Sequence, residues 1–346
     1  MMHSAYEEIV LNVGGPHYSG CPKEKRMHLG QIFIPAICAL LITVAPQMLR
    51  SQEPARQPFG TGSPNSGAQN RAQAHEPTEA ELECIAPCDP YPGKKKLLVV
   101  ADVQTGFQHD AINHAMGVIE EMGRKTGIYA AFLRTDSQLI TKGKITVTSK
   151  RYANRSINVR NLNYFDGIVL LGSGEGTLSD QQKADLLSFV HDDGKGLILG
   201  HAQGVNFYNW PEFAEMIGGF MAGEYPPTGM YARVVDPSWK AAAAFGKQSF
   251  LWVDQWPILK ADFKRGSVHT IIALDPSKMT EKERARRSDD YFPIVWAKDY
   301  GKGRVFNFTG GHNDATLDDP RSQTLLLEGI EWAMGLTDEN VSPDKK

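Results

Sequence analysis

Three histidines follow apolar runs that predict buried β-strands. His109, His201 and His312 each come shortly after such a run, with a glycine close before them. Because ligands bind beyond the carboxyl ends of parallel strands, we expect the three imidazoles at one edge of the sheet. There they could bind a transition metal, shuttle protons or hold a polyhydroxylated ligand. The residue types leave these three kinds of chemistry open.

An acid, an amide and an aromatic ring follow another predicted strand at residues 250–253. Asp254 is the acid, and Gln255 and Trp256 come directly after it. A carboxylate beside an aromatic ring suits a sugar, because the ring face stacks on the indole and the hydroxyls bond to the carboxylate. An ordinary strand-end turn with a core tryptophan explains the same residues, and both interpretations stay open.

These features define two sets of candidate site residues. The candidate catalytic residues are His109, His201, Asp254 and His312, and the three histidines are also the candidate ligands of a divalent metal such as zinc. The candidate substrate-binding residues are Phe107, Gln203, Trp210, Gln255, Trp256 and Asn313.

The elements that must position these residues follow an α/β pattern. Continuous apolar runs predict buried strands of a parallel sheet, and apolar spacing of three to four residues predicts helices between them. Shorter, alternating runs later in the chain predict an antiparallel extension of the sheet. The expected parallel strands are 96–101, 129–133, 167–171 and 196–199, the helices 110–124, 180–190, 211–217 and 322–334, and the later strands 231–235, 250–253, 270–274, 294–297 and 304–309.

Composition limits the function classes. The 346-residue chain has a formal net charge of −3 and no long basic run, which argues against a nucleic-acid partner and favours a small molecule. Its four cysteines all precede the first predicted strand, at Cys21, Cys38, Cys84 and Cys88. A cysteine nucleophile in the folded domain is therefore excluded.

The N-terminal region predicts export. Three basic residues precede an apolar stretch at 32–44, which is long enough for the core of a signal peptide and short for a membrane span. We expect residues 1–52 to be an export signal region, with Met27 as the true start, and the mature protein to be periplasmic or extracellular without a membrane span. An uncleaved membrane anchor is the alternative. Residues 53–93 read as a disordered linker, 94–336 as the folded domain and 337–346 as a flexible tail.

Several motifs occur in a familiar order. They are Gly106-Phe107-Gln108-His109-Asp110, Phe165-Asp166-Gly167, Gly200-His201-Ala202, Trp210-Pro211-Glu212-Phe213 with Ile217-Gly218-Gly219, and a last block from Pro293-Ile294-Val295-Trp296 through Tyr300-Gly301-Lys302-Gly303-Arg304-Val305 to Gly311-His312. Together, over roughly residues 95–335, these motifs resemble the ThuA-like (trehalose utilisation) family.

The resemblance implies a three-layer, flavodoxin-like fold of the class I glutamine amidotransferase type. In amidotransferases of that fold the nucleophilic cysteine occupies the turn where this chain has His201, so cysteine-dependent glutamine hydrolysis is excluded. The chain also departs from the family pattern in two places. Glu224-Tyr225-Pro226 stands where the family usually has a second His-Pro, and Asp254-Gln255 stands where it often has Asp-Glu.

The resemblance also implies a role in carbohydrate utilisation. We expect an enzyme that acts on a sugar or an oxidised sugar derivative in a histidine-lined pocket, with a small-molecule carbohydrate as partner. Because the two departures remove a histidine and a carboxylate, a non-catalytic carbohydrate-binding or interaction module is the alternative. The sequence leaves the oligomeric state open, a homo-oligomer included.

Overall fold

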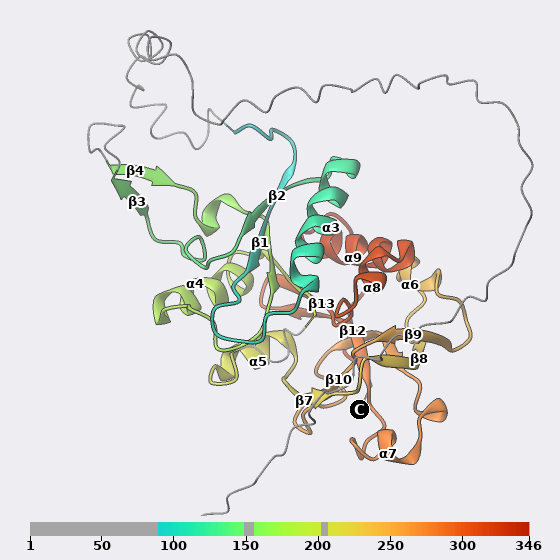
Figure 1. Cartoon of the computed structure of the whole chain (residues 1–346). Coiled ribbons are helices and arrows are strands. Elements are labelled where there is room, and N and C mark those ends of the chain that lie inside the picture. The colour runs from blue at the N-terminus through green and yellow to red at the C-terminus, as the bar shows by residue number, and fades with distance from the viewer. Residues whose placement is uncertain (1–88, 149–155, 202–206, 346) are drawn as a thin grey trace, which may run out of the picture. The chain divides into compact units, whose positions relative to one another are not determined.

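The computed structural model describes residues 89–148, 156–201 and 207–345, and these form an α/β domain around one large sheet (Figure 1). The sheet has nine strands. In spatial order they are β2 (Tyr129–Arg134), β1 (Lys95–Ala101), β5 (Gly167–Leu171), β6 (Gly196–Leu199), β13 (Gly303–Phe308), β12 (Pro293–Tyr300), β11 (His269–Leu274), β8 (Thr228–Val234) and β9 (Phe250–Asp254).

The sheet changes character at β13. From β2 to β13 every neighbouring pair is parallel, and from β13 to β9 every pair is antiparallel. The apolar side chains of β5 and β6 are all buried, as a strand covered on both faces requires, whereas β9 alternates between exposed and buried residues. The expected α/β sheet with an antiparallel extension is therefore confirmed.

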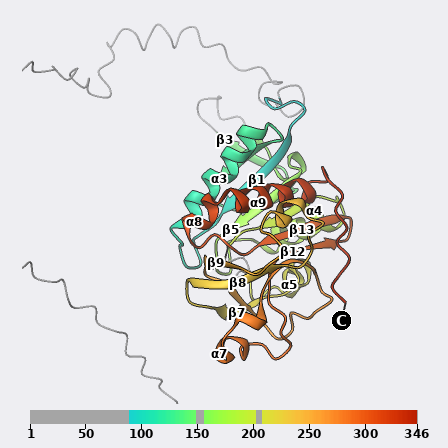
Figure 2. The same ribbon diagram turned by 90° about the vertical axis from the view of Figure 1, so that its right-hand side faces the viewer.

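Helices cover both faces of the sheet and make three layers (Figures 1 and 2). Leu97 and Val99 of β1 pack in the core on the side of α3 (Ala111–Thr126) and α9 (Pro320–Ala333). Their neighbours Leu98 and Val100 face the opposite core, on the side of α4 (Asp180–His191) and α5 (Pro211–Ile217). This alternation along one strand builds two hydrophobic cores from a single apolar run.

The longer helices begin and end where the sequence indicates. At the start of α4, Ser179 and Gln182 form a reciprocal capping box that satisfies two backbone N–H groups. At the end of α3, Gly127 adopts a left-handed conformation with φ of 73°, which costs least for glycine. The shorter elements are β3 (Ile145–Thr148), β4 (Ser156–Val159), β7 (Met221–Glu224), β10 (Pro257–Leu259), α6 (Lys240–Ala243), α7 (Glu281–Arg284), α8 (Asp314–Asp318) and the 3-10 turns η2 (Leu162–Tyr164) and η4 (Pro276–Lys278).

The C-terminal segment differs from the expected flexible tail. Val341 is buried, and the carboxylate of Asp344 accepts a hydrogen bond of 2.7 Å from the hydroxyl of Tyr291 and one of 3.1 Å from the backbone N–H of Thr270. The tail therefore packs along β11, an outcome that its polar composition did not predict.

The predicted N-terminal features fall outside the described residues. They are the export signal region, nearly all of the linker and the four cysteines. Within the described part of the chain, every helix is too short or too polar to cross a bilayer.

Candidate functional site

Three histidines from separate loops meet at the carboxyl edge of the parallel strands. His109 lies between β1 and α3, His201 follows β6, and His312 lies between β13 and α8. One ring nitrogen from each residue can be chosen so that all three lie within 4.8 Å of one another. The ring centroids are 4.9 to 5.2 Å apart. The sheet thus brings together residues more than two hundred positions apart, as expected for this edge.

The His201 ring has a defined orientation. Its Nδ1 lies 3.0 Å from the carbonyl oxygen of Thr309, so Nδ1 carries the proton and donates it to that oxygen. This tautomer leaves the lone pair of Nε2 directed at Nδ1 of His312, 3.1 Å away. A histidine that donates one N–H to a backbone carbonyl and presents its other nitrogen is the usual arrangement of a metal ligand.

Burial keeps two of the imidazoles neutral. Desolvation lowers the pKa of His201 to about 3, and the neighbouring histidines oppose a charge there as well. Desolvation, followed by the charge of His312, also lowers the pKa of His109. Nδ1 of His109 is buried and has no hydrogen-bond partner in the described part of the chain. Neutral imidazoles with a free lone pair are the form that binds metal.

The spacing of the nitrogens fits a zinc-sized ion. Zinc binds imidazole nitrogens at about 2.0–2.1 Å, so tetrahedral ligands lie about 3.3 Å from one another. The separation of 3.1 Å between Nε2 of His201 and Nδ1 of His312 is close to that value, and all three nitrogens lie within 4.8 Å of one another. Three protein ligands leave the fourth position open, as in catalytic zinc sites.

Asp254 positions the turn that carries His312. Its side chain is fully buried at the end of β9, and its oxygens accept hydrogen bonds from the backbone N–H groups of Gly311 at 2.8 Å and His312 at 3.1 Å. Burial raises the pKa of Asp254, and these N–H donors oppose the rise. Gly311 has a φ of 108°, a conformation suited to glycine, which lets the turn fold over the carboxylate. The geometry is that of a positioning residue.

Close contact between two glycine turns fixes the loop of His109. A Cβ on Gly106 would lie 2.1 Å from the carbonyl oxygen of Ser173, so only glycine fits there. The hydroxyl of Ser173 donates to the carbonyl oxygen of Phe107 at 2.9 Å. The turn after β5 therefore holds the turn after β1 in place.

The predicted substrate-binding residues have different surroundings. The Phe107 side chain is 71% exposed, and its ring lies 4.8 Å from that of His109. Asn313, directly after His312, and Gln255, beside Asp254, are partly exposed. Gln203 lies outside the described residues.

The two predicted tryptophan platforms are core residues instead, which corrects that part of the sequence interpretation. Trp256 is fully buried and donates its indole N–H to the carbonyl oxygen of Trp252. Trp210 is 5% exposed and stacks on Phe213. Both indole faces are occupied by packing, so neither is open to a sugar.

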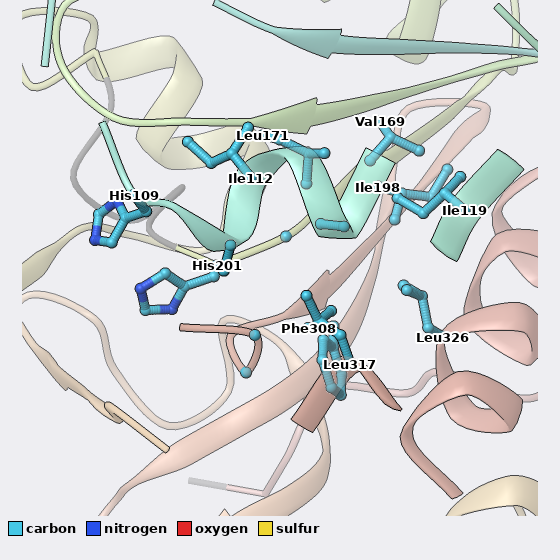
Figure 3. Close-up of a pocket in the computed structure, with 15 residues that line it drawn as sticks. His109, Ile112, Ile119, Val169, Leu171, Ile198, His201, Phe308, Leu317 and Leu326 are labelled. Carbon is cyan, nitrogen blue, oxygen red and sulfur yellow. The ribbon is translucent and has the colours of Figure 1, made fainter. Parts of the chain in front are cut away.

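A small apolar cavity lies behind the imidazoles of His109 and His201 (Figure 3). Its volume of about 20 Å³ is close to that of one water molecule. Its other walls are apolar side chains of α3, β5, β6, β13 and the C-terminal helices, among them Ile112, Leu171, Ile198 and Phe308. These walls make the inner side of the two rings apolar.

Two residues are missing from the sequence-based set: Glu224, which interacts with His312, and Tyr208, which interacts with Glu224. Glu224 is partly buried at the end of β7, where burial raises its pKa and the charge of His312 lowers it. Tyr208 is 39% exposed, and desolvation followed by the charge of Glu224 raises its pKa. The only sequence signal for Glu224 was its place in Glu224-Tyr225-Pro226, where the family usually has a second His-Pro. The strand β7 has four residues, which are too few for a periodic pattern to show which side chains are buried.

The fold and the cluster define an α/β protein with a histidine-lined sheet edge. The sequence profile of the trehalose utilisation family, ThuA, matches residues 96–333. The chain therefore belongs to the ThuA family, and the resemblance seen in its motifs is confirmed.

One of two ThuA-like solved structures agrees with that fold at a TM-score above 0.5. A putative ThuA-like protein from Bacteroides uniformis is 18% identical with a TM-score of 0.51, over 69% of this chain and 91% of that one. Another from Parabacteroides merdae is 17% identical with a TM-score of 0.47, over 73% of this chain and 97% of that one. Comparison with curated proteins gave no match.

Proposed function

We propose that this ThuA family protein is an enzyme of carbohydrate utilisation that binds a divalent metal, zinc first, through His109, His201 and His312. Its substrate is a sugar or an oxidised sugar derivative. The observation that carries the proposal is the cluster itself, in which three imidazole nitrogens lie within 4.8 Å and burial favours neutral rings at His109 and His201.

The chain's own residues provide orientation and a partly dry environment. Thr309 fixes the tautomer of His201 through its carbonyl oxygen, and Asp254 holds the backbone of His312. The apolar cavity lines one side of the rings with hydrocarbon side chains. A metal in this position would polarise a carbonyl or hydroxyl oxygen of the substrate from its open coordination position.

The test is the metal content of the full chain, purified without a metal-binding tag. We expect about one zinc per wild-type chain and a large loss in His201→Ala. The matched control is His114→Ala, which removes a histidine that pairs with Asp318 on the surface and is not one of the three clustered histidines. If wild-type protein holds no metal and added zinc leaves its melting temperature unchanged, the metal site is wrong.

A non-catalytic carbohydrate-binding role is the second candidate, and the exposure of Phe107 favours it. An aromatic ring that is 71% exposed beside a polar cluster offers a stacking surface without any chemistry. This role predicts that sugar binding survives His201→Ala and weakens in Phe107→Ala. The opposite pattern in a titration would count against it.

We also propose that the protein is exported. The support is the sequence alone, namely the basic residues before the apolar stretch at 32–44. Fractionation of cells that express the full chain, followed by N-terminal sequencing of the mature protein, tests this. An intact N-terminus in the cytoplasmic fraction would contradict export.

A further inference from the structure

Glu224 is a partly buried carboxylate without a direct partner. Throughout the described ranges, no N–H, hydroxyl or cation donates to its side chain, although burial raises its pKa. Its oxygens are not among the buried atoms without a partner, so they still reach solvent and can accept hydrogen bonds from a ligand.

Backbone contacts place Glu224 beside the histidine cluster. In β7 it pairs with Pro257 of β10, and the next residue, Tyr225, donates its N–H to the carbonyl oxygen of Trp256 at 2.9 Å. The same turn from β9 to β10 begins at Asp254, whose carboxylate binds the backbone of His312. Glu224 therefore lies near the turn that carries His312, and the charge of His312 lowers the pKa of its carboxyl group.

Tyr208 continues the surface on the side of β7. Its hydroxyl lies 3.5 Å from the carbonyl oxygen of Met221 in that strand, and the ammonium of Lys260 lies 4.7 Å from its ring centroid. The next residue, Asn209, donates its N–H to Glu175 at 3.4 Å, which connects this loop to the turn after β5. The Tyr208 ring also packs edge-on against Phe220, and the charge of Glu224 raises the pKa of its partly exposed phenol, so the two side chains are neighbours.

We propose that Glu224 and Tyr208 form the hydroxyl-binding wall of the site, where the carboxylate accepts hydrogen bonds from a sugar and the phenol contacts its ring. A carboxylate can accept from two neighbouring hydroxyls, and a tyrosine offers both an apolar ring and a polar tip. These two residues take the place of the buried Trp210 and Trp256 as the sugar-binding surface. The inference rests on the proposed function for its ligand class.

The test measures sugar affinity and zinc content separately in the full chain. The probes are α,α-trehalose, maltose and D-glucose, each titrated by calorimetry into wild type, Glu224→Gln and Tyr208→Phe. Because a hydrogen bond to a charged group is lost, we expect Glu224→Gln to weaken binding of the preferred sugar by about tenfold to a hundredfold. Tyr208→Phe should weaken it by about threefold to tenfold.

Matched controls separate this effect from general damage. Glu281→Gln on the exposed helix α7 and Tyr231→Phe on the exposed face of β8 should bind the sugar like wild type. Unchanged affinity in Glu224→Gln would overturn the inference, as would a wild-type protein that binds zinc but none of the three sugars. Absence of zinc in a wild-type protein whose sugar binding still depends on Glu224 would instead contradict the proposed metal site and support the inference.

Discussion

The buried ring of His201 should make the metal-free protein lose stability in acid. The pKa of His201 falls from 6.5 to about 3 in the folded chain, so the unfolded chain binds a proton there that the folded chain does not. The stability that this difference supplies is fully present above pH 6.5 and is lost as the pH falls from 6.5 towards 3. At about pH 5 the full shift would correspond to about 2 kcal/mol. Because part of the residue remains accessible to solvent, we expect about 1 to 2 kcal/mol.

Urea denaturation in the presence of a chelator measures this effect, because the loss of stability between two pH values can be compared in wild type and in a variant without the imidazole. The free energy of unfolding is compared at about pH 7 and about pH 5 for wild type and His201→Gln. Glutamine can still donate to the carbonyl oxygen of Thr309 but does not titrate. Wild type should lose about 1 to 2 kcal/mol more than the variant between the two conditions. Equal losses in the two proteins would refute the reasoning.

Four further predictions concern the site and the elements around it. Zinc at about one hundred times its dissociation constant should raise the melting temperature of wild type by about 5 to 10 °C, and by much less in His312→Ala, as differential scanning calorimetry would show. Asp254→Asn should lower the free energy of unfolding, measured by urea denaturation, by about 2 to 4 kcal/mol and weaken zinc binding, because the backbone N–H of His312 loses a charged acceptor. Unchanged zinc affinity would contradict the positioning role. Gly106→Ala should lower the free energy of unfolding by about 2 kcal/mol or more in the same assay, because the new Cβ would collide with the backbone of Ser173 in the turn after β5. By contrast, Gly117→Ala on α3 should raise the free energy of unfolding by about 0.5 to 1 kcal/mol, because alanine favours the helix and nothing lies within 4 Å of the new methyl group. A lower free energy of unfolding would contradict this reasoning from helix propensity.

Local sequence patterns were sufficient for the main elements. The apolar run at 167–171 predicts a strand that the structure confirms as β5. Ser179 and Gln182 have the spacing of a capping box and predict the start of α4. Continuous burial distinguishes strands of a parallel sheet, and a capping box marks a helix start, so these features depend on near neighbours only. The short strand β7 has too few residues for such a pattern, and it carries Glu224.

The sequence by itself determined the α/β class, the family and the placement of three histidines after strand ends. It could do so because parallel strands direct their carboxyl ends to one edge, whatever the details of packing. Only the tertiary structure decided which neighbouring groups are buried and which are open. Trp256 and Phe107 look equally suitable in the sequence, yet one is fully buried and the other is 71% exposed. Exposure depends on contacts between distant segments, and residue type alone does not determine it.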